Sequence, residues 1–277
     1  MHQRRNKLQA EGSVGVNVQR EARAEGGILA RITIANERKL NTLNRALMAE
    51  LIEALGRLGS DRDLRLVVLT GAGGCAFVGG ADIEEIAALD LAGARDYITL
   101  VHRSCDGCRH LPVPVIARID GYALGAGLEL AAACDLRVAS DRSQFGMPEV
   151  RVGIPSVVEA ALLPLLIGTG RARKLVLTGE MIGAAEALSW GLVDAVAAPD
   201  RLDAEIERLA AAILAGGPQA IRLQKALTLD WEEAPSAAAA IRRGIDRFAE
   251  AFATDEPKRM AGARLAAMRA RRGGEGS

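Results

Sequence analysis

The sequence predicts an α/β core followed by an all-helical C-terminal part. Three observations point to this fold class. Strand-like and helix-like patterns alternate through the first two-thirds of the 277 residues. The last third, from Asp203 to about Arg272, has helical periodicity only. An Ala-Gly-Gly-Pro break at 215–218 separates the two parts. We therefore expect a sheet-containing domain over 14–215 and a helical region over 216–277.

The first elements follow from hydrophobic patterning. The stretches VGVNVQREA and GILARITIAN predict a β-hairpin that turns at 25–27. A helix should follow, capped by Asn41 or Thr42, because leucines recur at 47, 51, 55 and 58. The run LRLVVLTGAG indicates a buried strand that enters a glycine loop, and residues 83–109 are predicted to be largely helical.

The second half of the core continues the alternation. PVIARIDGYAL predicts a strand and loop, LELAAACD begins a helix, and LRVASD is a further strand. After the loop GMPEVRVGIP, we expect a helix near 159–167. The segments KLVLTGE and AAEALSWGLVDAVA then add a helix and a strand. A βα unit recurs along the chain, although no fixed period is evident.

Composition excludes several function classes. The 35 basic and 35 acidic residues give no net charge, and aromatic residues are only 3%, which argues against nucleic acid as a partner. No apolar run reaches the roughly 18 residues of a membrane helix. Residues 1–13 lack the apolar segment of a secretory signal and are expected to be a disordered tail.

Cysteine usage points to a reducing, cytoplasmic location. The four cysteines have no spacing typical of a disulfide framework. Cys105 and Cys108 form a C-x-x-C pair, but a second pair that would complete a zinc site is absent from the sequence. We expect free thiols and no metal site.

One charged residue interrupts an apolar stretch. The segment GYALGAGLELAAACD contains Glu129 among small and apolar residues. Burying a carboxylate costs several kcal/mol unless the group is paired, hydrogen-bonded or protonated. Taken alone, a Glu in Leu-Glu-Leu is typical of an exposed helix position. Glu129 is therefore either such a position or a functional acid.

Three ordered motifs carry a family resemblance. TGAGGCAFVGGADI, PVIARIDGYALGAGLELAAACDLRVAS and FGMPEVRVGIP resemble the crotonase superfamily, the enoyl-CoA hydratase/isomerase group. The resemblance covers about residues 14–255 and is closest to the enoyl-CoA hydratases. It implies a ClpP-like spiral of ββα units with a helical trimerisation region. It also implies an acyl-CoA thioester ligand, no separate cofactor, and a homotrimer or a dimer of trimers.

The resemblance assigns two backbone donors to the reacting thioester. Such enzymes stabilise an enolate, which requires preorganised N–H groups at the carbonyl oxygen. By motif match these are the N–H groups of Ala81, in GGADI, and Ala126, in GAGLEL. Position 126 is commonly glycine in the family, so the alanine here leaves less space for the substrate to approach this N–H. The loops taken alone are equally consistent with tight turns.

The same resemblance makes two glutamates the catalytic pair. In hydratases of this family they hold a water between them, and their motif positions are Glu129 and Glu149. Glu129 is expected to take a proton from the attacking water, and Glu149 to exchange the proton at the α-carbon. Isomerases usually keep only the acid at position 149, so the presence of both favours hydration.

Further residues are expected along the CoA ester. Arg38, Lys39 and Leu40 match positions that contact the adenine and phosphate end, although an exposed Arg-Lys pair is common in any chain. Ala81, Asp82, Ile83 and Glu84 should line the thioester and pantetheine, with Asp82 also accepting hydrogen bonds at a helix start. His102 and His110 have no motif partner and are expected at a surface or interface.

One loop departs from the family pattern. Many hydratases have a glycine-rich loop where this chain has Ser156, Val157 and Val158, followed by a third acid, Glu159. The Ser156 N–H can still orient Glu149. Glu159 is either an acid favoured by a helix N-terminus or a sign of a polar substrate or altered water network.

This departure keeps the alternatives to hydration open. They are an isomerase, a hydratase of a specialised branched or polar acyl-CoA, and a non-catalytic acyl-CoA-binding protein.

Overall fold

The protein divides into two compact units. The computed structural model describes residues 14–274, with side chains to 269. The first unit ends at Ala210 and the second begins at Ala211, inside helix α9 (Leu202–Leu214). The sequence analysis placed this division a few residues later, between 215 and 216. The tail predicted for 1–13 lies outside the described residues.

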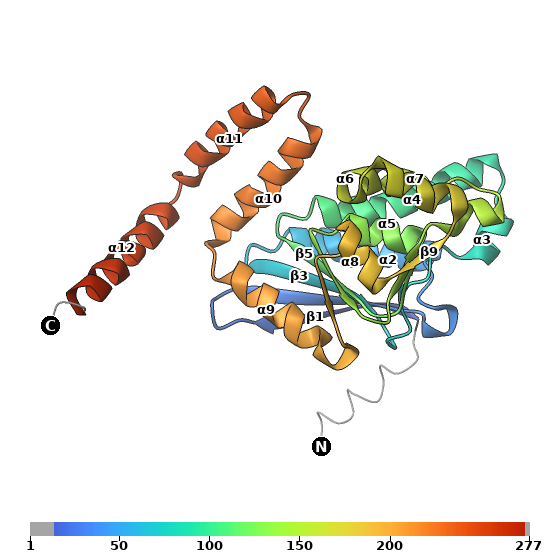
Figure 1. Ribbon diagram of the computed structural model, residues 1–277, viewed down its shortest axis with the longest axis horizontal. Coiled ribbons are helices and arrows are strands. Elements are labelled where there is room, and N and C mark those ends of the chain that lie inside the picture. Colours follow the sequence, from blue (N-terminus) through green and yellow to red (C-terminus); the bar gives the residue numbers. More distant parts are fainter. Residues whose placement is uncertain (1–13, 275–277) are drawn as a thin grey trace, which may run out of the picture. The chain divides into compact units, whose positions relative to one another are not determined.

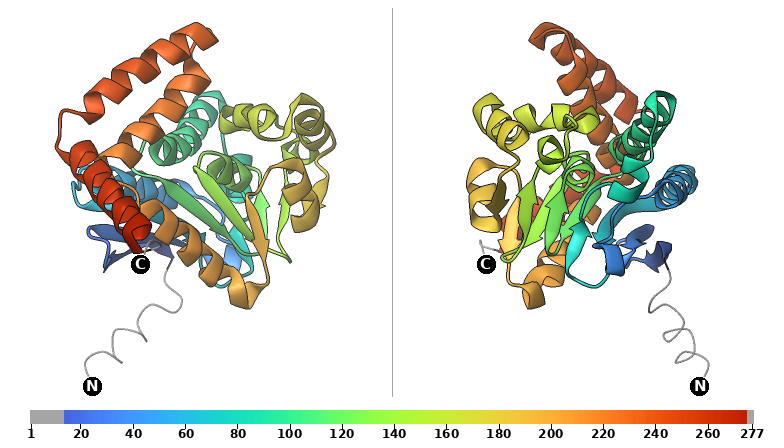
Figure 2. Two further views of the ribbon diagram at one scale, coloured as in Figure 1. Left: turned by 60° about the vertical axis from the view of Figure 1, so that its left-hand side comes forward. Right: turned by 90° about the vertical axis from the view of Figure 1, so that its right-hand side faces the viewer.

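Two β-sheets form the centre of the first unit (Figures 1 and 2). The larger has six strands in the order β1-β2-β3-β5-β7-β10, and the smaller has four in the order β4-β6-β8-β9. Neighbours are parallel except at β1–β2 and β8–β9. The strands are β1 (Gly15–Ala22), β2 (Ile28–Ala35), β3 (Leu64–Gly71), β4 (Ala76–Val78), β5 (Val115–Ile119), β6 (Tyr122–Leu124), β7 (Leu136–Ser140), β8 (Gln144–Gly146), β9 (Met181–Gly183) and β10 (Ala195–Ala197).

Strand burial follows the sequence patterns. The predicted hairpin is present, with Gly15 opposite Ala35 and Ala22 opposite Ile28. Strand β3 is buried along almost its whole length, as expected for a parallel strand covered on both faces. In the view of Figure 1, helices α4 and α5 lie above β3 and β5.

The chain alternates between the two sheets. Three times a strand of the large sheet (β3, β5, β7) is followed by a strand of the small sheet (β4, β6, β8) and then by helical segments. This repeated ββα unit confirms the predicted fold class. The helical segments that precede α9 in the first compact unit of the chain are η1 (Glu37–Lys39), α2 (Arg45–Gly59), α3 (Ile83–Ala87), α4 (Leu91–Arg109), α5 (Ala126–Ala132), η2 (Pro148–Val152), η3 (Val158–Leu162), α6 (Leu163–Ile167), α7 (Thr169–Thr178), α8 (Ala184–Trp190) and η4 (Pro199–Arg201).

The start of α2 differs from the prediction. Its N-cap is Asn44, whose side chain accepts a hydrogen bond from the Leu47 N–H at 2.8 Å. Asn41, one of the two predicted caps, is instead buried in a left-handed conformation (φ 56°). Its amide donates to the carbonyls of Ala72 (2.9 Å) and Ala76 (2.8 Å), so it joins this segment to the glycine loop after β3.

The second unit is helical, as the sequence predicted. It contains the end of α9 together with α10 (Pro218–Glu233), α11 (Ala237–Ala251) and α12 (Glu256–Gly274). The Glu256 carboxylate accepts hydrogen bonds from the Gln219 and Ala220 N–H groups and so caps α10. Arg243 and Arg247 of α11 both pair with Asp230 of α10.

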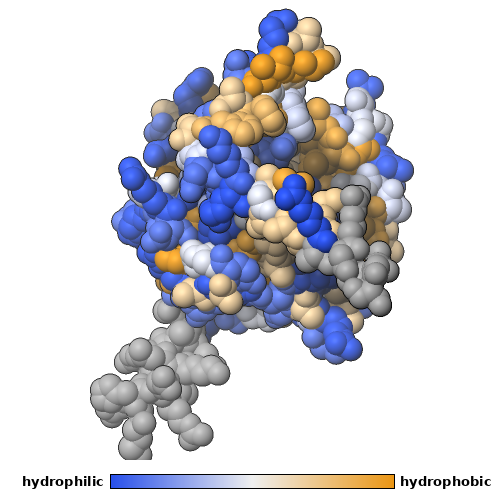
Figure 3. All heavy atoms as spheres, turned by 90° about the vertical axis from the view of Figure 1, so that its left-hand side faces the viewer, coloured by the Kyte–Doolittle hydropathy of each residue, from blue (hydrophilic) through white to orange (hydrophobic). Residues whose placement is uncertain are grey.

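Helix α11 leaves apolar side chains in solvent. Ile241, Ile245 and Phe248 follow helical spacing and are each about two-thirds exposed. Hydrophobic residues appear orange on the face drawn in Figure 3. Across residues 14–274, none of the helices combines the length and apolar character that crossing a bilayer requires.

Candidate active site

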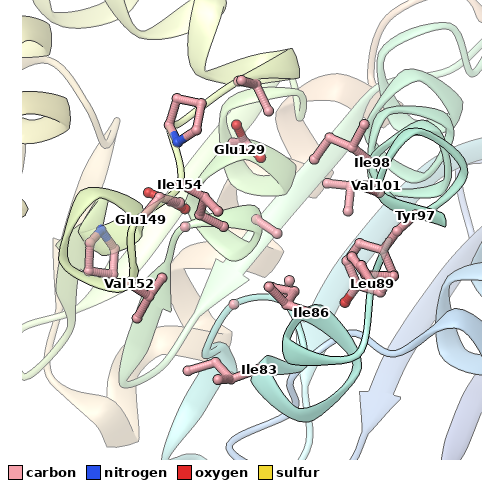
Figure 4. Close-up of a pocket in the computed structure, with 18 of the residues that line it drawn as sticks. Ile83, Ile86, Leu89, Tyr97, Ile98, Val101, Glu129, Glu149, Val152 and Ile154 are labelled. Carbon is pink, nitrogen blue, oxygen red and sulfur yellow. The ribbon is translucent and has the colours of Figure 1, made fainter. Parts of the chain in front are cut away.

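A mostly apolar cavity of about 700 Å³ lies in the first unit. Figure 4 shows that Glu129 and Glu149 reach it from different parts of the chain, and that most other labelled side chains around it are aliphatic. Two arginines, Arg95 and Arg151, also contribute to the lining. The aliphatic residues of the lining include Ile83, Ile86, Leu89, Leu91, Ile98, Val101, Leu124, Val152, Ile154 and Val157.

One wall is the loop between β4 and α3. Leu43 and Ala81 form an isolated parallel bridge, in which the Leu43 N–H donates to the Gly80 carbonyl (2.8 Å) and the Asp82 N–H to the Leu43 carbonyl (2.9 Å). In this pattern the flanking residues bond to Leu43, so the N–H of Ala81 itself points away from that partner. Ala81 lines the cavity, and its N–H is therefore available there.

A second N–H comes from the start of α5. Because the helix begins at Ala126, this N–H has no acceptor within the helix. Ala126 also lines the cavity. The neighbouring glycine, Gly127, lets the helix approach β4, since a Cβ there would lie 2.0 Å from the Val78 carbonyl oxygen. The two predicted donors, Ala81 and Ala126, thus lie in one cavity.

Glu129 lies one turn into α5 and is 3% exposed. The Ala160 N–H donates to its Oε1 at 3.1 Å. The pKa of Glu129 is raised to about 8, mainly by burial and then by the negative charge of Glu149. The charge of Glu159 also raises this pKa, whereas the backbone hydrogen bonds to the carboxyl lower it. The Glu129 carboxyl is therefore buried and hydrogen-bonded, and its affinity for a proton is raised, so that it can share one proton with Glu149 near neutral pH.

Glu149 is the second residue of the segment η2, which follows β8. The Ser156 hydroxyl donates to its Oε2 at 2.7 Å. The sequence analysis expected the Ser156 N–H in this role, whereas the structure uses the side chain. Gly125 leaves space for Oε1, because a Cβ on Gly125 would lie 2.2 Å from that atom. The Ser156 hydroxyl thus holds one carboxyl oxygen of Glu149, and the missing side chain of Gly125 makes room for the other.

The residues expected along CoA lie at the edge of this site. Asp82 is the N-cap of α3, as predicted, and accepts from the N–H groups of Glu84 (2.9 Å) and Glu85 (3.3 Å). Lys39 donates to Asp82 (3.0 Å) and to Glu84 (2.7 Å), so its charge is engaged by two acids. Burial raises the pKa of Asp82, but the hydrogen bonds from Lys39 and the helix N–H groups outweigh it and lower that pKa.

The remaining expected contacts are exposed. Arg38 and Leu40 lie on the surface, with Leu40 in a left-handed conformation (φ 53°). Ile83 is 62% exposed although it lines the cavity, which is expected of a residue at a cavity mouth. Ile83 is thus the only one of these three that also lines the cavity.

Tyr97, which the sequence motifs did not indicate, holds the loop between β4 and α3 in place. The Tyr97 hydroxyl donates to the Leu43 carbonyl (2.9 Å) and accepts from the Asp82 N–H (3.1 Å). Burial raises the pKa of Tyr97 to about 12, so the hydroxyl remains a donor. A tyrosine in an amphipathic helix only weakly indicates that its hydroxyl will bond to a distant loop.

His102 also has a partner that the sequence did not indicate. Its Nδ1 lies 2.7 Å from Oε1 of Glu159, and its side chain is about half exposed. His102 therefore lies at the surface, as expected, but its ring also contacts a buried acid. Glu159 itself is buried and lies outside the cavity lining.

Known proteins share both the sequence and the fold. The model of the family described as enoyl-CoA hydratase/isomerase matches residues 24–264. A crotonyl-CoA hydratase of Syntrophomonas wolfei is 36% identical over 83% of this chain and 88% of its own length. A short-chain-enoyl-CoA hydratase of Clostridium acetobutylicum is also 36% identical, over 84% and 89%. The crystal structure of an enoyl-CoA hydratase from Bacillus anthracis superimposes with a TM-score of 0.83 at 31% identity, covering 91% of this chain and 96% of that one. The chain belongs to the enoyl-CoA hydratase/isomerase family.

Proposed function

We propose that the protein is an enoyl-CoA hydratase, a hydro-lyase that adds water reversibly to a 2-enoyl-CoA and forms a 3-hydroxyacyl-CoA. One observation carries the proposal. Two carboxyl groups, Glu129 and Glu149, and two available backbone N–H groups, of Ala81 and Ala126, belong to one apolar cavity. The 36% identical relatives named as hydratases support the same reaction.

The backbone donors would stabilise the enolate. When water adds at the β-carbon, negative charge develops on the thioester oxygen. Two N–H groups aimed at that oxygen lower the barrier because they require no reorganisation during the reaction. The Ala126 N–H adds the partial positive charge of a helix N-terminus. Removing one such donor typically costs a factor of about 10²–10³ in kcat.

The two glutamates would move the protons. Water loses a proton to Glu129 as its oxygen bonds to the β-carbon, and Glu149 gives a proton to the α-carbon. The pair therefore carries one proton throughout: the proton starts on Glu149, ends on Glu129, and returns to Glu149 before the next turnover. Since hydration takes up no net proton, kcat/KM has the same pH dependence in both directions. The state with one shared proton is lost above the pKa of about 8 at Glu129.

The cavity favours an apolar acyl group. Its lining is mainly aliphatic, and Glu159 does not belong to it, so Glu159 gives no support to a polar acyl group. Coenzyme A enters as part of the substrate, and the proposed steps use no metal or redox cofactor. Lys39 would meet CoA phosphate only after leaving Asp82 and Glu84. We place the reaction in the cytoplasm.

The test is loss of the conjugated enoyl thioester absorbance with purified protein. The panel runs from short to long and branched 2-enoyl-CoAs, with products separated to distinguish a hydrated from an isomerised acyl group. Glu149→Gln and Glu129→Gln should each lower kcat by about 10³-fold or more, because both proton transfers need a carboxyl group. Absence of turnover on every member, or an active double variant, would refute the proposal.

We further propose that the chain acts as a homotrimer or a dimer of trimers. Support comes from the exposed apolar residues of α11, Ile241, Ile245 and Phe248, since unpartnered apolar faces of this kind mark protein interfaces. Light scattering coupled to size exclusion gives the mass directly. Ile245→Glu should shift the species towards monomer, and a monomeric wild type would refute this part.

A further inference from the structure

A third acid, Glu159, interacts with Glu129 but does not line the cavity. Glu159 is 7% exposed, and its Oε1 contacts Nδ1 of His102 at 2.7 Å. Its other oxygen, Oε2, is buried without a hydrogen-bond partner among the described residues. Because Glu159 does not line the cavity, it acts on the site only through its neighbours.

Glu159 belongs to the short segment that holds Glu129. The next residue, Ala160, supplies the N–H that donates to Glu129 Oε1. The preceding residue, Val158, has φ 40°, a conformation that is strained for a β-branched side chain. Such strain persists only where the surroundings impose it. The contact with His102 ties this segment to α4, and the Ala160 N–H ties it to α5.

Charged and titratable groups surround Glu159 on two helices. His102, Cys105 and Asp106 face it from α4, and Glu129 interacts with it from α5. Burial raises the pKa of Glu159, and the hydrogen bond from His102 opposes that rise. In turn, the charge of Glu159 adds to the rise in the pKa of Glu129.

We propose that His102 and Glu159 form a positioning pair for Glu129, in which the anchored Glu159 keeps the Ala160 N–H on the Glu129 carboxyl and places a negative charge behind it. This inference rests on the proposed hydration. It concerns two residues that do not touch the substrate. Its consequence is that the pair sets both the orientation and the proton affinity of Glu129.

Three variants separate the two effects. Glu159→Gln keeps the shape but removes the charge, and His102→Leu removes the anchor. His102→Asn retains a donor near the position of Nδ1. The matched control is His110→Leu, because His110 is the C-cap of the same helix, has the same 49% side-chain exposure and pairs with Asp106 at 2.8 Å.

The expected results differ among these variants. Glu159→Gln should move the alkaline limb of the kcat/KM profile down by about one pH unit, the size of a one-charge effect at close range. His102→Leu should lower kcat about tenfold with little change in KM, and His102→Asn should restore most of it. His110→Leu should leave kcat and the profile unchanged.

A second measurement does not depend on turnover. The titration of Glu129 can be followed by NMR with ¹³C-labelled glutamate carboxyls, using Glu129→Gln to assign the signal. Its midpoint should fall in Glu159→Gln and stay in His110→Leu. If the wild type hydrates no enoyl-CoA, the proposed function fails while this titration still tests the pair.

The inference is overturned by any of three results in folded variants. These are an unchanged Glu129 midpoint in Glu159→Gln, an effect of His102→Leu that His110→Leu reproduces, and a His102→Asn variant no better than His102→Leu. Circular dichroism checks each fold. If His102→Leu does not fold, Glu159→Gln and His102→Asn still test whether the pair positions Glu129.

Discussion

Gly125→Ala should displace Glu149 without removing it. The added Cβ would lie 2.2 Å from Oε1 and 3.2 Å from Cδ of Glu149. Carbon and oxygen atoms that are not bonded need more than 3 Å, so the carboxyl must move by about 1 Å. A misplacement of that size at a reacting group costs about 10²-fold in rate. The far end of a glutamate can move, so the fold should survive.

Backbone strain adds a separate cost. Gly125 has φ 51°, which disfavours alanine by about 1–3 kcal/mol. Gly26→Ala is the control for this term, because Gly26 has φ 91° and its Cβ would meet open space in the hairpin turn. Both variants should lose stability, and only Gly125→Ala should lose activity.

The assay combines enoyl thioester absorbance with thermal unfolding. We expect kcat to fall about 10²-fold in Gly125→Ala, with Gly26→Ala within about twofold of wild type. A Gly125→Ala protein that keeps wild-type kcat would show that the close approach to Glu149 does not control its position. Equal losses in both variants would assign the effect to backbone strain alone.

Three further predictions concern pH and stability. The kcat/KM for hydration should fall as pH rises through about 8, where the glutamate pair loses its shared proton; a flat profile to pH 9 (about one unit beyond the Glu129 pKa) would contradict this. Folded Glu129 has a pKa of about 8 against an ordinary 4.5, so the native state binds more protons between these values and the free energy of unfolding falls as pH rises across them. Glu129→Gln should remove this slope, on the order of a few kcal/mol in total, as chemical denaturation at several pH values would show. Asn41→Ala should destabilise by about 3 kcal/mol, since it leaves three backbone partners of a buried amide unpaired; a loss below about 1 kcal/mol would refute that role.

Sequence patterns predicted the strands better than the loop contacts. The hairpin, the buried strand β3 and the helical C-terminal unit follow from local periodicity, so the sequence contains their signals directly. The cap of α2 was misplaced because Asn41, Thr42 and Asn44 are all good capping residues, and the choice depends on carbonyls more than 30 positions away.

The candidate site shows the same limit. Motif positions predicted two glutamates and two N–H donors, and the fold brings these four residues into the lining of one cavity. Ser156 was expected to orient Glu149 through its N–H, whereas its hydroxyl makes the contact. The contacts of Tyr97 and His102 were not predicted, because their partners lie more than 50 positions away in the sequence. Lys39 shows the same limit for a binding residue. Its position in the sequence suggests a contact with phosphate, whereas in the structure it is paired with Asp82 and Glu84.

The cavity divides into parts that can change independently. Glu129, Glu149 and the N–H groups of Ala81 and Ala126 stand on segments fixed by backbone hydrogen bonds and by close packing at Gly125 and Gly127. Another part of the lining comes from α3 and α4, where Ile83 and Leu91 are 62% and 89% exposed. Substitutions at these two exposed positions should reshape the cavity at little cost to folding, whereas Tyr97 of α4 is buried and hydrogen-bonded. A single scaffold can thus acquire new substrates through drift at such positions, and directed evolution of specificity should begin with Ile83 and Leu91.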